Sequence, residues 1–147
     1  MPYAYDHPHM AVTADAVVLT REDPPRVLLI QRAQPPFQGL WAIPGGFVDM
    51  DERAAAAAAR ELAEETGVTG VSLSFLGYFD TVGRDPRERT LSLAFWGTVA
   101  DATAAPAAAA DDAADLAWKP IDCLPPLAFD HAEILAAAVR AAQGLLT

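Results

Sequence analysis

The chain has little of what secreted and membrane proteins depend on. Its 147 residues contain one cysteine, Cys123, which excludes an internal disulfide and fits a reducing compartment. We interpret Cys123 as a small buried hydrophobic residue. No apolar run approaches the roughly 20 residues of a membrane span, and the start, Met1 to Tyr3, shows no signal peptide. We therefore expect a cytoplasmic protein that does not bind membranes.

Positive charge is also scarce. The chain has 10 lysines and arginines against 20 aspartates and glutamates, a net charge of −10. Nucleic acid is therefore not an expected partner, because its backbone needs a basic patch. An acidic protein that acts on an anionic substrate needs metal ions to bridge the two. The apolar fraction of 52% is inflated by alanine, and the length fits one domain over residues 1–147.

Acidic side chains are concentrated in one stretch, between Gly46 and Val68. A run of alanines and the absence of Gly or Pro before Gly67 predict a helix from about Arg53 to Thr66. At about 100° per residue, one small and mostly apolar stripe should pack against a sheet. This stripe consists of Ala55, Ala58, Ala59, Leu62 and Thr66.

Three carboxylates crowd a neighbouring face of the same helix. Glu61, Glu64 and Glu65 stand at i, i+3 and i+4, and like charges one turn apart destabilise an isolated helix by roughly 0.2–0.5 kcal/mol. Arg60 can neutralise one of them, or it can reach back to Glu52. Divalent cations best supply the missing charge, and clustered carboxylate oxygens suit Mg²⁺ or Mn²⁺.

The other elements are indicated by β-branched runs and turn residues. A last helix is expected from Phe129 to Gln143, stopped by Gly144, with a core stripe of Ile134, Leu135, Ala138 and Ala142. Pro44 to Gly46 should turn sharply, because glycines adopt conformations closed to other residues and let a carbonyl approach an ion. Strands are expected over Ala11–Thr20, Arg26–Arg32, Leu40–Ile43, Val71–Asp80, Arg89–Val99 and Leu116–Pro120.

Two loops separate these strands. Thr81 to Glu88 is polar and carries two arginines, and Asp101 to Asp115 is rich in alanine and aspartate with Pro106 inside it. The second loop is expected to be mobile, although Ala107 to Ala114 could form two helical turns. Strands with a helix between them indicate a mixed sheet with helices on both faces.

The acidic stretch resembles the Nudix box. Gly46, five residues, Glu52, seven residues, Arg60-Glu61-Leu62, one residue, Glu64-Glu65, one residue and Gly67-Val68 match its positions. The alternative is a solvated acidic helix. The resemblance covers essentially the whole chain and implies an α/β/α sandwich with a mixed β-sheet. It also implies hydrolysis of a nucleoside diphosphate linked to another moiety.

The resemblance assigns roles to residues of the box. It implies metal ligation by Glu61, Glu64, Glu65 and the carbonyl of Gly45, with Glu61, Glu64 and Arg60 in the catalytic set. Glu52, paired with Arg60, would be structural, as would Gly46 and Gly67. The family often takes a general base from outside the box. The candidates are Asp111 and Asp112, which could equally be solvated loop residues, and then Glu88.

Three further segments resemble the ADP-ribose pyrophosphatase branch and related domains that bind ADP-ribose-like ligands as sensors. They contain Arg32 with Pro35–Trp41, Gly83–Arg87 and Leu127–His131. Substrate-binding candidates are Arg32, Arg84 and Arg87, with planar forks for phosphate, and Phe37 and Phe79, with faces for adenine. Surface roles for Arg84 and Arg87 and core roles for both phenylalanines remain alternatives. Asp130 and His131 are expected to cap and anchor the last helix, in preference to catalysis by His131.

These observations leave three functions open. The first is a Mg²⁺-dependent pyrophosphatase that cuts ADP-ribose to AMP and ribose 5-phosphate. The second is a hydrolase of nucleoside triphosphates, including oxidised or pterin-bearing ones. The third is an inactive ADP-ribose-binding sensor, against which the intact glutamates argue. The resemblance favours a homodimer, to which an exposed Pro-rich N-terminus could contribute.

Overall fold

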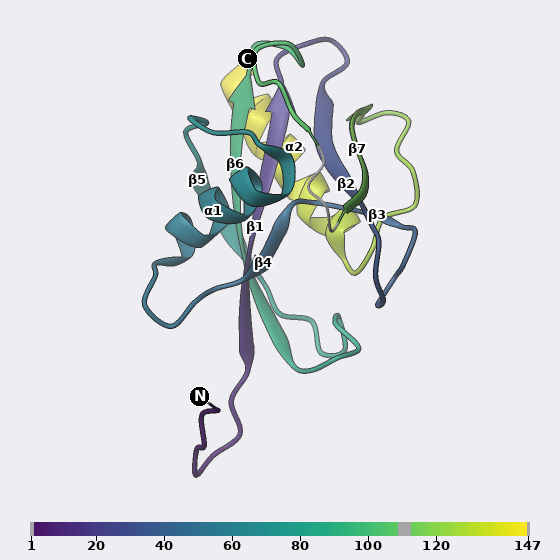
Figure 1. Cartoon of the computed structure of the whole chain (residues 1–147). Coiled ribbons are helices and arrows are strands. Elements are labelled where there is room, and N and C mark those ends of the chain that lie inside the picture. Colours follow the sequence, from purple (N-terminus) through teal and green to yellow (C-terminus); the bar gives the residue numbers. More distant parts are fainter. Residues whose placement is uncertain (1, 109–112, 147) are drawn as a thin grey trace.

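The computed structural model describes residues 2–108 and 113–146, and within them it contains a sheet and two helices (Figure 1). Along the chain the elements are β1 (Ala11–Thr20), β2 (Arg26–Arg32), β3 (Trp41–Ala42), β4 (Gly45–Phe47), α1 (Ala54–Thr66), β5 (Ser74–Phe79), β6 (Thr90–Val99), β7 (Ala113–Pro120) and α2 (His131–Leu146).

The sheet is mixed, and β1 lies at its centre. The strand order is β3-β2-β1-β6-β5, with β4 paired to β1 and β7 paired to β2. β1 runs parallel to β6 along its whole length, from Ala11 opposite Thr90 to Thr20 opposite Val99. Its other edge is shared, because β4 pairs with the first half of the strand and β2 joins near its end.

The two helices cover opposite faces of the sheet (Figure 1). Since strand side chains alternate between faces, β1 supplies both cores. Ala14, Ala16 and Val18 pack with α1, whereas Val17 and Leu19 pack with α2. The α/β/α sandwich with a mixed sheet is confirmed. Among the described residues, none of the helices has the length and apolar character needed to cross a bilayer.

The helices confirm part of the predicted packing and correct part of it. All four residues of the α2 stripe are buried, but the helix continues through Gly144 to Leu146. A helical glycine costs only about 1 kcal/mol relative to alanine. α1 ends at Thr66 and is capped by Gly67, whose φ of 76° is left-handed.

The buried face of α1 is rotated from the expected stripe. Ala57, Ala58, Leu62 and Thr66 are buried, whereas Ala55 and Ala59 are exposed and their prediction was wrong. The rotation brings Glu61 and Glu65 to the edge of the buried face.

The glycines before α1 form a strand where a sharp turn was expected. Gly45 and Gly46 pair with Asp15 and Ala14 of β1, and neither has a left-handed φ. Their small size matters instead. A Cβ on Gly45 would lie 2.0 Å from Asp15 Oδ1, and one on Gly46 would lie 2.5 Å from the carboxyl carbon of Glu61.

The described part of the Asp101–Asp115 loop, residues 101–108 and 113–115, has anchors that its sequence did not reveal. Asp101 Oδ1 accepts hydrogen bonds from the backbone of Thr103 and Ala104, Ala105 is buried, and the Ala108 N–H donates to Thr66 O at 2.8 Å. No helical turn forms at 107–108 or 113–114, and β7 begins at Ala113.

Cys123 is exposed, so its interpretation as a buried residue was wrong.

Candidate functional site

Arg60 ties the loop before α1 to the helix. Its Nη2 and Nε bind the two carboxylate oxygens of Glu52 at 2.6 and 3.0 Å, and Nη2 also donates to Phe47 O at 3.1 Å. The predicted Arg60–Glu52 pair is therefore present. Glu52 Oε1 accepts a further bond from the Asp49 N–H. These hydrogen bonds favour the carboxylate and hold the pKa of Glu52 below its ordinary value.

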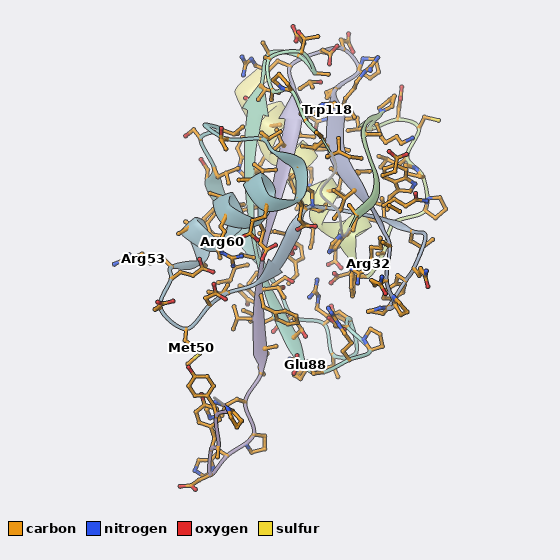
Figure 2. All side chains as sticks on the ribbon, viewed as in Figure 1. Arg32, Met50, Arg53, Arg60, Glu88 and Trp118 are labelled. Carbon is orange, nitrogen blue, oxygen red and sulfur yellow. The ribbon has the colours of Figure 1, made fainter. Side chains whose placement is uncertain are left out.

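The same guanidinium meets two more carboxylates. Arg60 Nη1 lies 2.8 Å from Glu61 Oε1 and 3.2 Å from Glu64 Oε2. The two glutamates differ in setting, because the Glu61 side chain is 15% exposed and that of Glu64 is 59% exposed. Figure 2 labels Arg60, with Met50 and Arg53 in the outer loop between β4 and α1. The Arg60 guanidinium thus forms ion pairs with Glu52, Glu61 and Glu64.

Glu65 points toward β4. Its Oε1 accepts a hydrogen bond of 2.9 Å from the Gly45 N–H. Glu61, Glu65 and Gly45 line one cavity of about 230 Å³ with residues from the end of β2 and the start of β7. We call it the carboxylate cavity. Its other lining residues are Ile30, Gln31, Arg32, Ala33, Gln34 and Ala113.

This arrangement suits a hard divalent cation at its inner edge. Glu61 and Glu65 are one helical turn apart, beside backbone that glycine keeps open, since a Cβ on Gly46 would lie only 2.5 Å from the Glu61 carboxyl carbon. Oxygen donors of this kind match Mg²⁺ and Mn²⁺. In the part of the chain that the structure describes, no three acidic, His or Cys side chains converge on one point; Glu64 turns outward to Arg60.

A second cavity, of about 110 Å³, adjoins the first. Four residues, Ile30, Arg32, Gly45 and Glu65, line both. We call the second one the polar cavity, because polar side chains of β1, β6 and α2 line it together with charged and aromatic residues of the loops. Among its lining residues are Thr13, Asp15, Phe47, Arg84, Asp85, Arg87, Ser92, Phe129 and His131.

Two arginines share one aromatic ring at this cavity. The guanidinium carbons of Arg32 and Arg87 lie 5.0 and 5.8 Å from the centre of the Phe129 ring. Phe37 meets Phe129 edge-on at 4.8 Å. Burial and the nearby charge of Arg87 lower the pKa of Arg32. Two cations held this close favour an anion between them.

The guanidinium group of Arg84 is not available to bind a phosphate in the cavity. Its Nε and Nη2 bind the Asp130 carboxylate at 2.9 and 2.5 Å, and its side chain is 3% exposed. Asp130 therefore anchors the start of α2 through Arg84, and both its carboxylate oxygens face the arginine instead of capping the helix. Arg87 is similarly forked to Asp85, with its side chain 41% exposed.

His131 joins α2 to the chain before β4. Its Nδ1 accepts a hydrogen bond of 2.9 Å from the buried Ile43 N–H, which confirms the anchoring prediction. Burial lowers the pKa of His131 to about 3, because a charged imidazole would be removed from water. The ring is therefore neutral at pH 7, with its hydrogen on Nε2.

The remaining candidates are dispersed. Phe79 packs against the α2-side core and lines neither of the two cavities. Glu88 is exposed in the loop before β6, where Figure 2 labels it. Asp111 and Asp112 lie outside the described residues. Sequence reasoning missed Asp15, Phe129 and Asp85. A charged residue inside the apolar run AVTADAVVLT was the available signal for Asp15.

Comparison with known proteins gives the family context. The NUDIX domain model matches residues 10–138. The chain is 37% identical over 136 residues to an ADP-ribose pyrophosphatase of Methanocaldococcus jannaschii, covering 92% of this chain and 77% of that protein. It is 32% identical over 97 residues to the ADPR responsive transcriptional repressor NtrR of Acinetobacter baylyi, covering 64% of this chain and 39% of the repressor.

A solved structure resembles nearly the whole chain. The NUDIX domain of Shewanella oneidensis NrtR, complexed with ADP ribose, superposes with a TM-score of 0.83 at 31% identity. The match covers 97% of this chain and 94% of that domain.

Proposed function

The chain belongs to the NUDIX family and is a Nudix hydrolase, and we propose that it is a Mg²⁺-dependent pyrophosphohydrolase that cleaves ADP-ribose to AMP and ribose 5-phosphate. The observation that carries the proposal is the junction of the carboxylate cavity with the polar cavity at Arg32, Gly45 and Glu65. A metal site and an anion site that share a wall suit a diphosphate with a group at each end.

In this proposal the carboxylate cavity binds the metal ion. Glu61 and Glu65, with the backbone at Gly45, would hold Mg²⁺ or Mn²⁺. When bound, the ion neutralises phosphoryl oxygens and lowers the pKa of coordinated water. Arg60 fixes the helix against the preceding loop, which keeps Glu61 in place. Glu64, the outermost of the three, would contribute by exchanging Arg60 for the metal when substrate binds.

The aromatic and cationic side would hold the rest of the substrate. Arg32 and Arg87 flank Phe129 and supply positive charge for the diphosphate. Phe129 and Phe37 offer ring surface for adenine. We assign Arg84 to positioning the Thr81–Glu88 loop, because its fork is occupied by Asp130 and its side chain is 3% exposed. Arg87 is also paired, to Asp85, but its side chain is 41% exposed and can reach a ligand. Phe79 packs against the α2-side core and lines neither cavity, so it does not belong to this set.

The general base in this proposal is Asp112, with Asp111 beside it. Asp112 immediately precedes Ala113, which lines the carboxylate cavity. Glu88 is the alternative. Asp112→Asn should lower kcat much more than it changes KM.

Relatives support both the substrate and a second candidate function. One relative is named for ADP-ribose pyrophosphatase activity, and the NUDIX domain of NrtR was solved with ADP ribose. Another relative is an ADPR responsive repressor, of which this chain covers 39%. An ADP-ribose-binding sensor is therefore the second candidate. The complete set of box glutamates favours the enzyme.

The proposal includes a homodimer in the cytoplasm. Residues 2–10 are all exposed and extend away from the sheet (Figure 1), with Tyr3 and Tyr5 at 66% and 51% exposure. Exposed aromatic side chains on a protruding arm suit contact with a second copy. Light scattering on the full chain and on a variant lacking residues 2–10 tests this assignment. The single cysteine fits the reducing environment of the cytoplasm.

A substrate panel tests the activity. The purified chain is assayed with Mg²⁺ on ADP-ribose, nucleoside triphosphates and diadenosine polyphosphates, and products are identified by chromatography. We expect the highest kcat/KM for ADP-ribose, with AMP and ribose 5-phosphate in equal amounts. Higher kcat/KM for any triphosphate overturns the substrate assignment. Tight ADP-ribose binding without turnover of any member of the panel supports the sensor instead.

A further inference from the structure

One end of the layer between the sheet and α2 is polar. Along β1, the side chains that face α2 are Thr13, Asp15, Val17 and Leu19, by the alternation of a strand. Val17 and Leu19 belong to the apolar core under α2. Thr13 and Asp15 instead line the polar cavity, together with Ser92 of β6 and His131 of α2.

Asp15 is the unusual member of this group. The residue is 4% exposed, and its Oδ1 lies against Gly45, where an added Cβ would come within 2.0 Å. Its Oδ2 is buried and has no hydrogen-bond partner among the described residues. An unsatisfied buried polar group destabilises a fold by about 1–3 kcal/mol, and more when charged. A buried carboxylate that destabilises the fold in this way suggests a role in binding or catalysis.

The neighbours of Asp15 already have partners of their own, although the Ser92 side chain also lies within hydrogen-bonding reach of the Asp15 carboxyl group. Thr13 Oγ1 and Ser92 Oγ share a hydrogen bond of 2.5 Å. Arg84, whose charge acts most strongly on Asp15, directs its fork to Asp130. His131 uses Nδ1 for the Ile43 N–H, so Nε2 remains as its donor. The cavity floor therefore combines a carboxylate acceptor with a neutral ring that can donate.

This combination selects a hydroxyl group over a phosphate. A hydroxyl can donate to the Asp15 carboxylate and accept from an imidazole N–H. Burial raises the pKa of Asp15 to about 7, so above pH 7 the carboxylate form predominates and disfavours a phosphate at this position. The cavity volume of 110 Å³ is well below the roughly 300–1,000 Å³ of a complete ligand pocket. It takes one part of a substrate, next to the cations at Arg32 and Arg87 and the wall at Gly45 and Glu65.

We propose that Asp15 is a specificity-determining residue that accepts a hydrogen bond from a sugar hydroxyl of the substrate in the polar cavity. The inference rests on the proposed function, because the sugar is the one attached to the diphosphate held at the junction. It extends that function by making recognition depend on a hydroxyl-bearing sugar as well as on the phosphates.

The test pairs Asp15→Asn with analogues of ADP-ribose that lack single hydroxyls on either ribose. Affinity is measured by calorimetry in EDTA, and kcat/KM with Mg²⁺. For the wild type, deleting the recognised hydroxyl should weaken binding about ten- to hundredfold, the range for a hydrogen bond to a charged group. In Asp15→Asn the same deletion should cost less than about threefold. Asp15→Ala provides a second variant with the same expectation.

Glu22→Gln is the matched control. Glu22 also has a buried carboxylate oxygen with no partner in the described part of the chain, but it lines a separate cavity with Leu19, Ile121 and Val139. For every analogue, the Glu22→Gln variant should lose as much affinity as the wild type does. Penalties that are the same in wild type and in both Asp15 variants overturn the role of Asp15 while leaving the proposed function intact. Failure of the wild type to bind or cleave ADP-ribose overturns the proposed function first.

Discussion

Single residues in this protein are defined by partners far away in the sequence. Arg84 and Asp130 are 46 positions apart, yet the arginine fork closes on that carboxylate. The sequence shows that Arg84 has a planar fork but not which anion it meets. The pairing of Arg60 with Glu52 was predictable because the two residues are 8 positions apart, Arg60 in the helix and Glu52 in the loop before it.

The Arg84–Asp130 pair predicts a loss of stability when it is broken. Both side chains are largely buried, at 3% and 16% exposure, so Arg84→Ala leaves a carboxylate without its partner. We expect the free energy of unfolding to fall by about 3 kcal/mol. Urea denaturation measures it, with Arg89→Ala as the control, since the Arg89 side chain donates an exposed bond to Asp80 O. Equal stability of the two variants, with weaker ADP-ribose binding by Arg84→Ala alone, would instead favour phosphate contact.

His131 predicts a pH dependence with a definite sign. Its pKa is about 3 in the folded chain against an ordinary value of 6.5, so between these values the unfolded chain binds the extra proton. The stability associated with the neutral ring is complete above pH 6.5 and is lost as pH falls. The loss should reach about 2 kcal/mol between pH 6.5 and 5, at 1.4 kcal/mol per unit.

His131→Asn isolates this effect, because the asparagine oxygen can still accept from the Ile43 N–H. The charged groups that act on His131 are Asp130, Arg84 and Arg32, and the variant retains all three. The difference in unfolding free energy between wild type and variant should therefore shrink as pH falls from 6.5 to 5. A difference that stays constant over this range contradicts the assignment.

At the scale of elements, the site depends on how closely α1 lies against β4. The bounds of β1 and β2 were predictable because β-branched and aliphatic runs end at turn residues. The buried face of α1 was not, because six consecutive alanines give almost no contrast between faces. The strand at Gly45–Phe47 was missed for a related reason: glycine marks close approach as readily as a turn.

Gly46 tests the packing of these two elements. In Gly46→Ala, the new Cβ would meet the Glu61 carboxylate at 2.5 Å, and the flexible side chain would move aside. We expect nearly unchanged thermal stability and a fall in kcat of about a hundredfold, the effect of a catalytic group displaced by about 1 Å. Gly77→Ala is the matched strand control, because no atom of the described residues lies within 4 Å of its added Cβ. Equal activity of the two variants would show that Glu61 needs no fixed position.

At the scale of the whole molecule, the carboxylate cavity and the polar cavity meet at Arg32, Gly45 and Glu65. Composition predicted the need for cations, since a net charge of −10 repels an anionic substrate. The sheet order then brings the β2 end, β4 and the start of α2 together. Asp15 and Phe129 join the site only through this arrangement. A charge within an apolar run and a ring within Leu127–His131 marked these positions in the sequence without showing their roles.

The central claim is that Glu65 and its neighbours hold a divalent cation that is required for cleavage. The most direct measurement is the rate of ADP-ribose hydrolysis as Mg²⁺ is titrated into metal-free protein, for wild type, Glu65→Gln and the exposed-carboxylate control Asp51→Asn. We expect no turnover without Mg²⁺, saturable activation of wild type and Asp51→Asn, and at least about a hundredfold lower kcat in Glu65→Gln. Metal-free turnover at the full rate, or undiminished activity of Glu65→Gln, would contradict the claim.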